Sequence, residues 1–257
     1  MGRAWFRFQF LKYKYLKRGE AEVALIRHLI EPGTTAVDAG ASVGFYAAEM
    51  ARFAGKVVAF EANPQVAALA RRVLPRNVDV VNVALSATSG LVTLRIPLNQ
   101  KGEPVSELAT IQEHSPHSGA MSNIDIEARQ LDDCGIANCS FIKMDVEGHE
   151  EAVLEGASKL IAAQQPLLMA ELDEGLNPGT AKRFGARLAA THYRGFFLSR
   201  GKLHPMESFD PAAHQDQALL AYSRKTLPTD REYINNFGFI PEKKCASILA
   251  RIASGRR

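Results

Sequence analysis

The sequence lacks several features that would place it in a specialised class of protein. It has no apolar run of the roughly 18 residues that a membrane-spanning helix needs, and residues 1–18 hold no secretory signal. Cysteine is scarce: Cys134, Cys139 and Cys245 are spaced neither as a disulfide framework nor as a zinc site. We therefore expect a cytoplasmic chain with reduced thiols.

Net charge is also nearly absent. The 257 residues carry 31 basic and 28 acidic side chains, a formal charge of +3, and 46% of them are hydrophobic. This balance is typical of a globular protein with a substantial core and excludes a disordered chain. The basic excess lies at the start, where residues 1–18 hold six cations and no acid: Arg3, Arg7, Lys12, Lys14, Lys17 and Arg18.

Residues 1–18 interleave these cations with six aromatic side chains. A docking helix that covers the neighbouring domain, with Lys and Arg stems over the aromatics, is the favoured interpretation. A peripheral contact with the cytoplasmic face of a membrane is the second, and stacking on RNA bases is the third. The aromatic residues concerned are Trp5, Phe6, Phe8, Phe10, Tyr13 and Tyr15.

Segments of strand and helix character alternate through most of the chain. This alternation predicts an α/β fold, a doubly wound and mostly parallel sheet of the Rossmann-like kind. An N-terminal helix is expected over residues 20–30, ended by Pro32 and Gly33. Further helices are expected over 45–53, 65–74, 150–163 and 180–191, and strands over 35–38, 56–61, 78–84, 91–96, 140–145, 166–171, 195–199 and 217–222.

Three regions follow from this pattern. Residues 1–32 form a basic and aromatic helical segment, residues 33–225 the α/β domain, and residues 226–257 a helical tail. Within the domain, residues 97–123 are rich in proline and glycine and show no sustained period, so we expect a lid or substrate loop there.

Polar residues gather where the expected strands end, which is where open α/β sheets bind ligands. Asp38 precedes the small-residue turn Gly40–Gly44, and Glu61 follows 23 positions later, near the ~20-residue offset of a ribose-binding carboxylate. The glycine patterns of dinucleotide and triphosphate sites are missing, and an acid beside the turn would repel phosphate. These features favour S-adenosylmethionine; tight packing of helix on strand is the alternative meaning of the turn.

Five blocks of the sequence resemble the FkbM-type methyltransferases. The block over 145–150, Asp-Val-Glu-Gly-His-Glu, is the most specific. Two positions differ from the common pattern: Ser42 stands where the family usually has Asn, and Ala62 where it usually has Pro. The five blocks cover residues 19–22, 36–44, 58–64, 141–150 and 166–171.

The resemblance implies a class I methyltransferase fold with S-adenosylmethionine as methyl donor and S-adenosylhomocysteine as product. It further implies transfer to a hydroxyl of a sugar, glycolipid or natural-product acceptor. The methionine half of the cofactor would lie on the glycine turn, the ribose on Glu61, the adenine at the end of the third strand and the methyl group at Asp145. The implied cofactor residues are Asp38, Gly40, Ser42, Gly44, Glu61, Asn63, Ala84, Leu85, Ser86 and Asp145.

A hydroxyl acceptor has to lose its proton, so a general base is expected beside Asp145. His149 is the first candidate because of its near-neutral basicity, with Glu147 and Glu171 as alternatives. Helix capping or packing is an equally weighted role for His149. His114 and His117 of the expected lid are weaker candidates.

Three further hypotheses concern a metal, another acceptor and a role without catalysis. Asp145, Glu147, Glu171 and Asp173 are oxygen ligands of the type that Mg²⁺ prefers, but no spacing rule requires a metal, and none is expected. Methylation of an amine or of nucleic acid is disfavoured because the fourth strand does not end in [DN]-P-P-[YF]. A scaffold protein without catalysis is suggested by the departures at Ser42 and Ala62.

Overall fold

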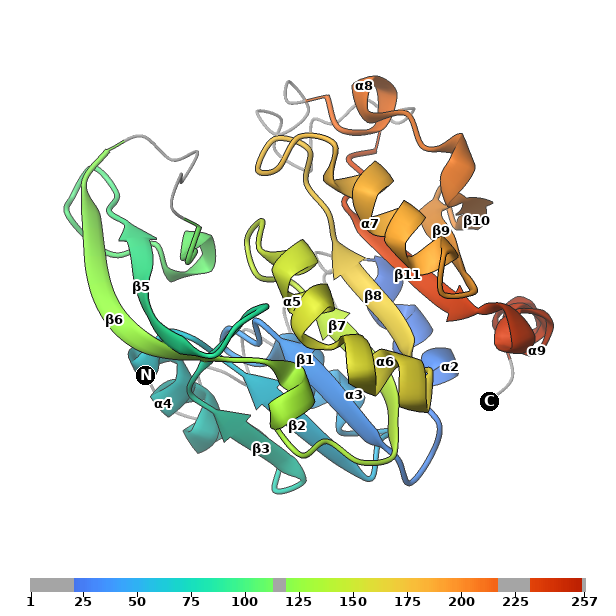
Figure 1. Cartoon of the computed structure of the whole chain (residues 1–257), viewed down its shortest axis with the longest axis horizontal. Coiled ribbons are helices and arrows are strands. Elements are labelled where there is room, and N and C mark those ends of the chain that lie inside the picture. The colour runs from blue at the N-terminus through green and yellow to red at the C-terminus, as the bar shows by residue number, and fades with distance from the viewer. Residues whose placement is uncertain (1–20, 113–118, 217–231, 256–257) are drawn as a thin grey trace.

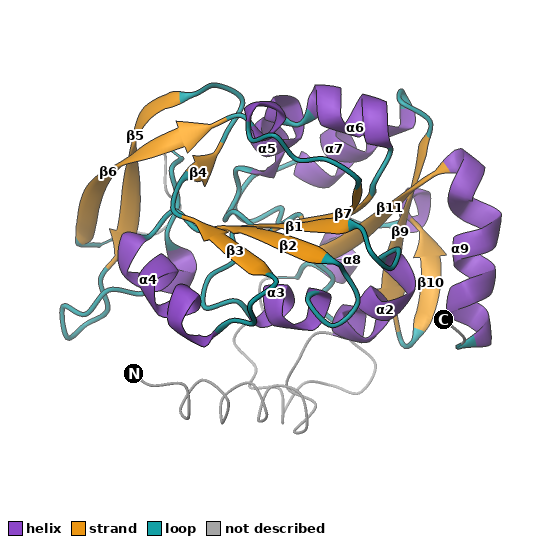
Figure 2. Cartoon of the chain, turned by 90° about the horizontal axis from the view of Figure 1, so that it is seen from below, coloured by secondary structure: helices purple, strands orange, loops and turns teal. Residues whose placement is uncertain are grey.

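The computed structural model describes residues 21–112, 119–216 and 232–255. These residues form a large sheet with helices on both faces and a smaller sheet beside it (Figures 1 and 2). The basic and aromatic segment 1–18, the lid histidines His114 and His117, and the expected strand over 217–222 lie outside the described residues.

Within the described residues, the large sheet has eight strands in the order β10-β9-β11-β8-β7-β1-β2-β3. The run from β8 to β3 is parallel, whereas β11 pairs antiparallel with both β8 and β9, and β10 pairs antiparallel with β9. The predicted, mostly parallel α/β sheet is therefore confirmed. Its strands are β1 Thr35–Ala39, β2 Lys56–Phe60, β3 Val78–Val81, β7 Cys139–Met144, β8 Leu167–Glu171, β9 Tyr193–Ser199, β10 Lys202–Pro205 and β11 Asn236–Pro241.

Helices cover both faces of this sheet, as Figure 2 shows with the sheet seen edge-on. Neighbouring residues of the buried strands point to opposite faces, so Val37 and Ile142 pack in one core and Ala36 and Phe141 in the other. The first core is covered by α5 Glu150–Gly156, α6 Ser158–Gln164 and α7 Thr180–Ala189. The second is covered by α2 Ile26–Leu29, α3 Phe45–Met50, α4 Pro64–Val73 and α9 Glu242–Ser254.

The segment expected as a third strand over 78–84 divides between the two sheets. Its first part, Val78–Val81, is β3 of the large sheet. Ala84–Leu85 forms β4 of a three-stranded sheet with β5 Gly90–Pro97 and β6 Met121–Arg129. Asn82 marks the division, because its side chain donates to the carbonyls of Glu61 at 2.8 Å and Ala62 at 2.9 Å. The hairpin of β5 and β6 stands away from the large sheet (Figure 1).

Other boundaries also differ from the sequence-based expectation. The helix expected over 150–163 is two helices that meet at Ala157, and the tail expected to be helical contains β11 before α9. Within the expected loop 97–123, a 3-10 turn, η2 Ser106–Leu108, lies between β5 and β6. The remaining short helices are η1 Ala21–Leu25, η3 Leu131–Asp133, η4 Met206–Ser208 and α8 Pro211–His214.

Two smaller expectations concern thiols and membranes. The three cysteines are free, as expected. Within the described ranges, none of the helices combines the length and the apolar character that crossing a bilayer demands.

The turn after β1 depends on glycine at position 40. Gly40 has φ +80°, and a Cβ placed there would lie 1.7 Å from the carbonyl oxygen of Asp145. Gly33 has φ +79° but no atom within 4 Å of the same position, so it isolates the effect of backbone conformation. The two glycines therefore separate conformational strain from close packing.

We expect Gly40→Ala to cost more than about 3 kcal/mol of unfolding free energy, because the main chain at Asp145 has to move. Gly33→Ala should cost only about 1–2 kcal/mol, the penalty of a left-handed L-residue. Urea unfolding of both variants measures the difference. Equal losses would show that β1 and β7 can separate at this point without cost.

Candidate functional site

A cavity of about 300 Å³ lies at the carboxyl ends of β1, β2, β7 and β8. Its other walls come from β4, from β5 and from residues 106–111, which belong to the loop expected over 97–123. Ten of the sequence-predicted site residues line it: Asp38, Gly40, Ser42, Glu61, Ala84, Leu85, Asp145, Glu147, His149 and Glu171. The sheet thus brings most of the expected site together.

Glu61 is fixed by the backbone at the end of β2. Its Oε2 accepts from the N–H of Ser42 at 2.7 Å, and its Oε1 accepts from the N–H of Asn63 at 2.7 Å. Burial raises the pKa of Glu61 to about 7 although both N–H groups oppose the shift. Each carboxylate oxygen keeps a further lone pair, so Glu61 can accept two hydroxyl groups of a ligand while it is held in place.

Asp38 is buried at the end of β1, and neither of its oxygens has a hydrogen-bond partner within the described residues. Burial raises its pKa to about 6, and the positive charge of Lys143 opposes this shift. The backbone N–H of Ala47 also lowers the pKa, but it does not reach hydrogen-bond geometry. A buried carboxylate without a partner is costly, and a donor or cation bound in the cavity would relieve that cost. Asp38 therefore suits a ligand with a positively charged group.

Lys143 is a site residue that the sequence-based prediction missed. It is 1% exposed, and its Nζ lies 2.7 Å from Oδ2 of Asp145 and 4.3 Å from the ring centroid of Tyr46. The carboxylates of Asp145, Asp38 and Glu171 outweigh burial and raise its pKa, so the amine stays charged. A lysine inside the apolar run Phe141–Met144, two residues before Asp145, was the available signal.

Three predicted cofactor residues lie beside the cavity and not in its lining. Gly44 precedes α3, where a Cβ would lie 2.7 Å from the Leu74 side chain. Asn63 begins α4, since its Oδ1 accepts from the N–H groups of Gln65 and Val66. Ser86 bonds His149 through its hydroxyl. Asn63 and Ser86 thus act on the site through Glu61 and His149.

The residues after β7 form a sharp corner that carries Glu147. Glu147 has φ +51° and Gly148 φ +89°, and a left-handed residue other than glycine costs on the order of 1–3 kcal/mol. The buried carboxylate of Glu150 accepts from the N–H groups of Val146 at 2.9 Å and Gly148 at 3.2 Å and so holds the corner. Burial, the largest cause, and nearby carboxylates raise the pKa of Glu147 to about 8.

His149 does not cap helix α5 with its side chain. Its Nε2 lies 2.9 Å from the hydroxyl oxygen of Ser86. Burial lowers the pKa of His149, so the ring is neutral near pH 7. A neutral imidazole suits a base, although one ring nitrogen is engaged by Ser86.

Asp145, Glu147 and Glu171 line the same cavity, and Asp173 lies outside its lining. Within the described part of the chain, no group of three or more histidine, cysteine, aspartate or glutamate side chains is arranged to hold a metal. Asp173 accepts from the hydroxyl of Tyr233 at 2.7 Å and from the N–H of Gly175 at 2.7 Å. Glu171 accepts from the side-chain amide of Asn235.

The cavity as a whole has an excess of acidic groups. Among the described residues that line it are five carboxylates and one lysine, and its apolar wall includes Phe60, Val83 and Leu94. Such a site favours a cationic or neutral ligand with one apolar end and repels phosphates. This chemistry agrees with the absence of a phosphate-binding glycine pattern in the sequence.

The chain is similar to several solved structures. A methyltransferase FkbM from Methylobacillus flagellatus KT is 17% identical, with a TM-score of 0.50 over 82% of this chain and 44% of that chain. Precorrin 8w decarboxylase from Methanobacterium thermoautotrophicum is 14% identical, with a TM-score of 0.42 over 86% and 89% of the two chains. Precorrin-6y C5,15-methyltransferase from Geobacter metallireducens GS-15 is 14% identical, with a TM-score of 0.41 over 71% of this chain and 79% of that chain.

The fold is the Rossmann-like fold of class I methyltransferases. The sequence model of the methyltransferase FkbM domain matches residues 38–198, more than half of the chain. The chain therefore belongs to the FkbM methyltransferase family, and the predicted resemblance is confirmed. It spans less than half of the length of the solved FkbM relative. No curated protein matches the sequence.

The buried Glu150 gives folding stability a dependence on pH. Its pKa rises from 4.5 to about 7, mainly because of burial, so folding binds a proton that the unfolded chain has lost. Protonation of Glu150 therefore stabilises the folded state. This contribution is fully present below pH 4.5, the pKa in the unfolded chain, and is lost as the pH rises through about 7.

We expect Glu150→Gln to make the loss of stability between pH 5 and pH 8 smaller by on the order of 2 kcal/mol. The amide oxygen of Gln can keep both bonds to Val146 and Gly148, because a single oxygen of Glu150 makes them. Urea unfolding at several pH values tests this. Parallel pH curves for the two proteins would contradict it.

Proposed function

We propose that this chain transfers a methyl group from S-adenosylmethionine to a hydroxyl oxygen of a sugar, glycolipid or other natural-product acceptor. The observation that carries the proposal is the unpartnered, buried Asp38 in the same cavity as the backbone-held Glu61. Asp38 offers an acceptor to a cationic group, and Glu61 offers acceptors to two neighbouring hydroxyls. Membership of the FkbM family supports the reaction class.

The residues present fit this cofactor. Asp38 would hold the ammonium or sulfonium side of the methionine half, Glu61 would hold the ribose hydroxyls, and the apolar wall with Val83 and Leu85 would take the adenine. The excess of acid supports a cationic cofactor over a phosphorylated one. When bound, the cofactor supplies a methyl group on a sulfonium that is left as a neutral thioether.

The charge of the cavity assists binding more than it assists the chemical step. Carboxylates attract a sulfonium, but that charge disappears during transfer, so their attraction is strongest before the transition state. Rate enhancement then depends on alignment, which can contribute ~7–11 kcal/mol, and on removal of the acceptor proton.

Among the three candidate bases, Glu147 has the best support. Within the described residues its carboxylate makes no hydrogen bond or ion pair, whereas Nε2 of His149 is engaged by Ser86 and Glu171 by Asn235. Burial raises the pKa of Glu147 to about 8, and a cation bound nearby would lower it and make the carboxyl group ionise more readily. Asp145, bonded to Lys143, lies next to it in the cavity wall.

The remaining expectations concern location and partners. A cytoplasmic site of action, with residues 1–18 docked on the domain or in contact with a membrane surface, is kept as a proposal. Those residues lie outside the described part of the chain. A glycolipid acceptor would suit contact with a membrane, and nucleic acid is not proposed as a partner.

We expect S-adenosylhomocysteine to bind and Glu61→Gln to weaken this binding at least about tenfold, or ~1.4 kcal/mol. Gln offers one oxygen where Glu61 uses two, so either Ser42 or Asn63 loses its acceptor and the ribose loses one as well. Isothermal titration calorimetry measures both constants, with the exposed Glu127→Gln as matched control. Unchanged affinity in Glu61→Gln would remove Glu61 from the cofactor site.

Incubation of the protein and S-adenosylmethionine with a panel of sugars and glycolipids should add the mass of one CH₂ unit to an acceptor. Mass spectrometry detects this gain, and Glu147→Gln should lower its rate by about 10²–10⁴-fold if Glu147 is the base. A gain on amines alone would contradict the proposed O-methyl transfer.

A further inference from the structure

The corner at Glu147 and Gly148 is held by residues far away in the sequence. On the side of the smaller sheet, the hydroxyl of Thr110 donates to the carbonyl oxygen of Glu147 at 2.9 Å. The side-chain amide of Gln112 donates to the carbonyl oxygen of Gly148. Both residues belong to the loop between β5 and β6, and Thr110 is buried.

This part of the loop is itself bound to the smaller sheet. The backbones of Thr110 and Arg95 exchange two hydrogen bonds, of 2.8 and 3.0 Å, and the guanidinium of Arg95 donates to the carbonyl of Gln112 at 3.1 Å. The N–H of Gln112 also donates to the hydroxyl oxygen of Thr110 at 3.2 Å. Residues 110 and 112 are therefore linked to a strand and can fix the corner that they contact.

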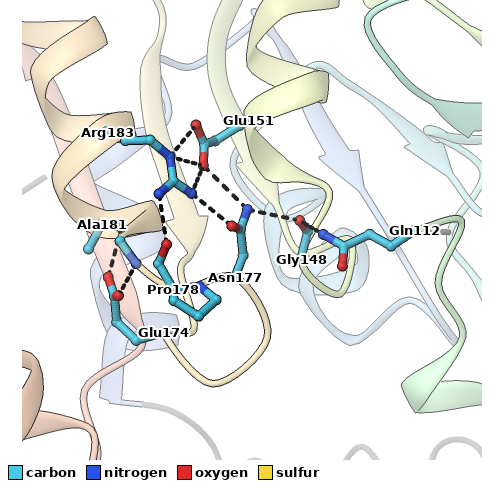
Figure 3. A network of polar contacts seen from close by, with 9 residues as sticks. Gln112, Gly148, Glu151, Glu174, Asn177, Pro178, Ala181 and Arg183 are labelled. Atoms are coloured by element: carbon cyan, nitrogen blue, oxygen red, sulfur yellow. Dashed lines mark hydrogen bonds and ion pairs between the residues drawn. The ribbon is translucent and has the colours of Figure 1, made fainter. Parts of the chain in front are cut away.

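A second contact approaches the corner from the opposite side, as Figure 3 shows. Asn177, in the loop after β8, points its side-chain amide toward the carbonyl of Gly148 at 3.5 Å. The Asn177 oxygen accepts from Arg183 of α7 at 2.7 Å, and Arg183 also pairs with Glu151 of α5 at 2.7 Å. The carbonyl of Gly148 thus accepts hydrogen bonds from two loops, the β5–β6 loop through Gln112 and the loop after β8 through Asn177.

We propose that Thr110 and Gln112 are positioning residues for the methyl transfer, because they dock the β5–β6 loop on the corner and hold the Glu147 carboxylate in the cavity. This inference rests on the proposed function. In the step, the bond from acceptor oxygen to methyl carbon forms and the carbon–sulfur bond breaks, with its electron pair passing to sulfur. The hydroxyl proton passes to Glu147.

The surroundings of Glu147 make its position measurable. Loss of solvent is the main cause that raises the pKa of Glu147. The charges of Asp145, Glu150 and Asp173 raise this pKa further, and the charge of Lys143 lowers it. Thr110 and Ile111 lie in the wall of the same cavity. If the loop leaves the corner, water reaches the carboxylate and its titration moves toward the ordinary value for glutamate.

The test is a ¹³C-carboxyl NMR titration of the full chain, with the Glu147 signal assigned from its loss in Glu147→Gln. Unmodified protein should titrate at a midpoint of about 8. Thr110→Val, which keeps the shape and removes the donor, should lower the midpoint by about one pH unit. Thr110→Ser should restore it, and Thr93→Val, which removes a hydroxyl bonded to Asp125 on the same sheet, should leave it unchanged.

A midpoint in Thr110→Val equal to that of the unmodified protein would overturn the inference, and so would an ordinary glutamate midpoint in the unmodified protein. If Thr110→Val does not fold, Gln112→Ala takes its place with the same expected shift. Calorimetry with S-adenosylhomocysteine on the same samples separates the two proposals. Absent binding would overturn the proposed function, and with it the role in methyl transfer, even if the titration shifts as expected. An unshifted titration with normal binding would overturn only the positioning role.

Discussion

The structure depends on one ionic contact, in which the buried ammonium of Lys143 lies 2.7 Å from the partly exposed carboxylate of Asp145. Lys143 lies on β7 directly beside Asp38 of β1, so one ammonium faces two carboxylates at the ends of neighbouring strands. Burying any of these charges alone would be strongly unfavourable, and together they offset one another in part. The offset is incomplete because Asp38 has no hydrogen-bond partner within the described residues, and this makes the cavity receptive to a cation.

Two different constraints shape the cavity around this contact. On the β2 side, backbone N–H groups fix Glu61, so its position follows directly from the turn after β1 and the start of α4. On the β7 side, the corner that carries Glu147 accepts hydrogen bonds from Thr110 and Gln112 of the β5–β6 loop and from Asn177 of the loop after β8. The first wall is therefore a local product of the fold, and the second exists only when distant loops have assembled.

The same distinction explains how much the sequence alone could predict. The strands at 35–39 and 56–60, the glycine turn and the strand-end acids Asp38 and Glu61 follow from local patterns, and the structure places them as predicted. The strand β6 was missed, although apolar and polar residues alternate strictly over 124–129. The separation of β4 from β3 and the docking of Thr110 depend on tertiary contacts that no local pattern records.

The position of β11 also bears on how the chain is made. This strand comes from residues 236–241, yet it fills the place between β8 and β9. Until those residues leave the ribosome, β8 has an open edge and the hairpin of β9 and β10 has no sheet to join. The nascent protein therefore exposes aggregation-prone backbone until residues 236–241 have been translated, and the sheet is completed only then.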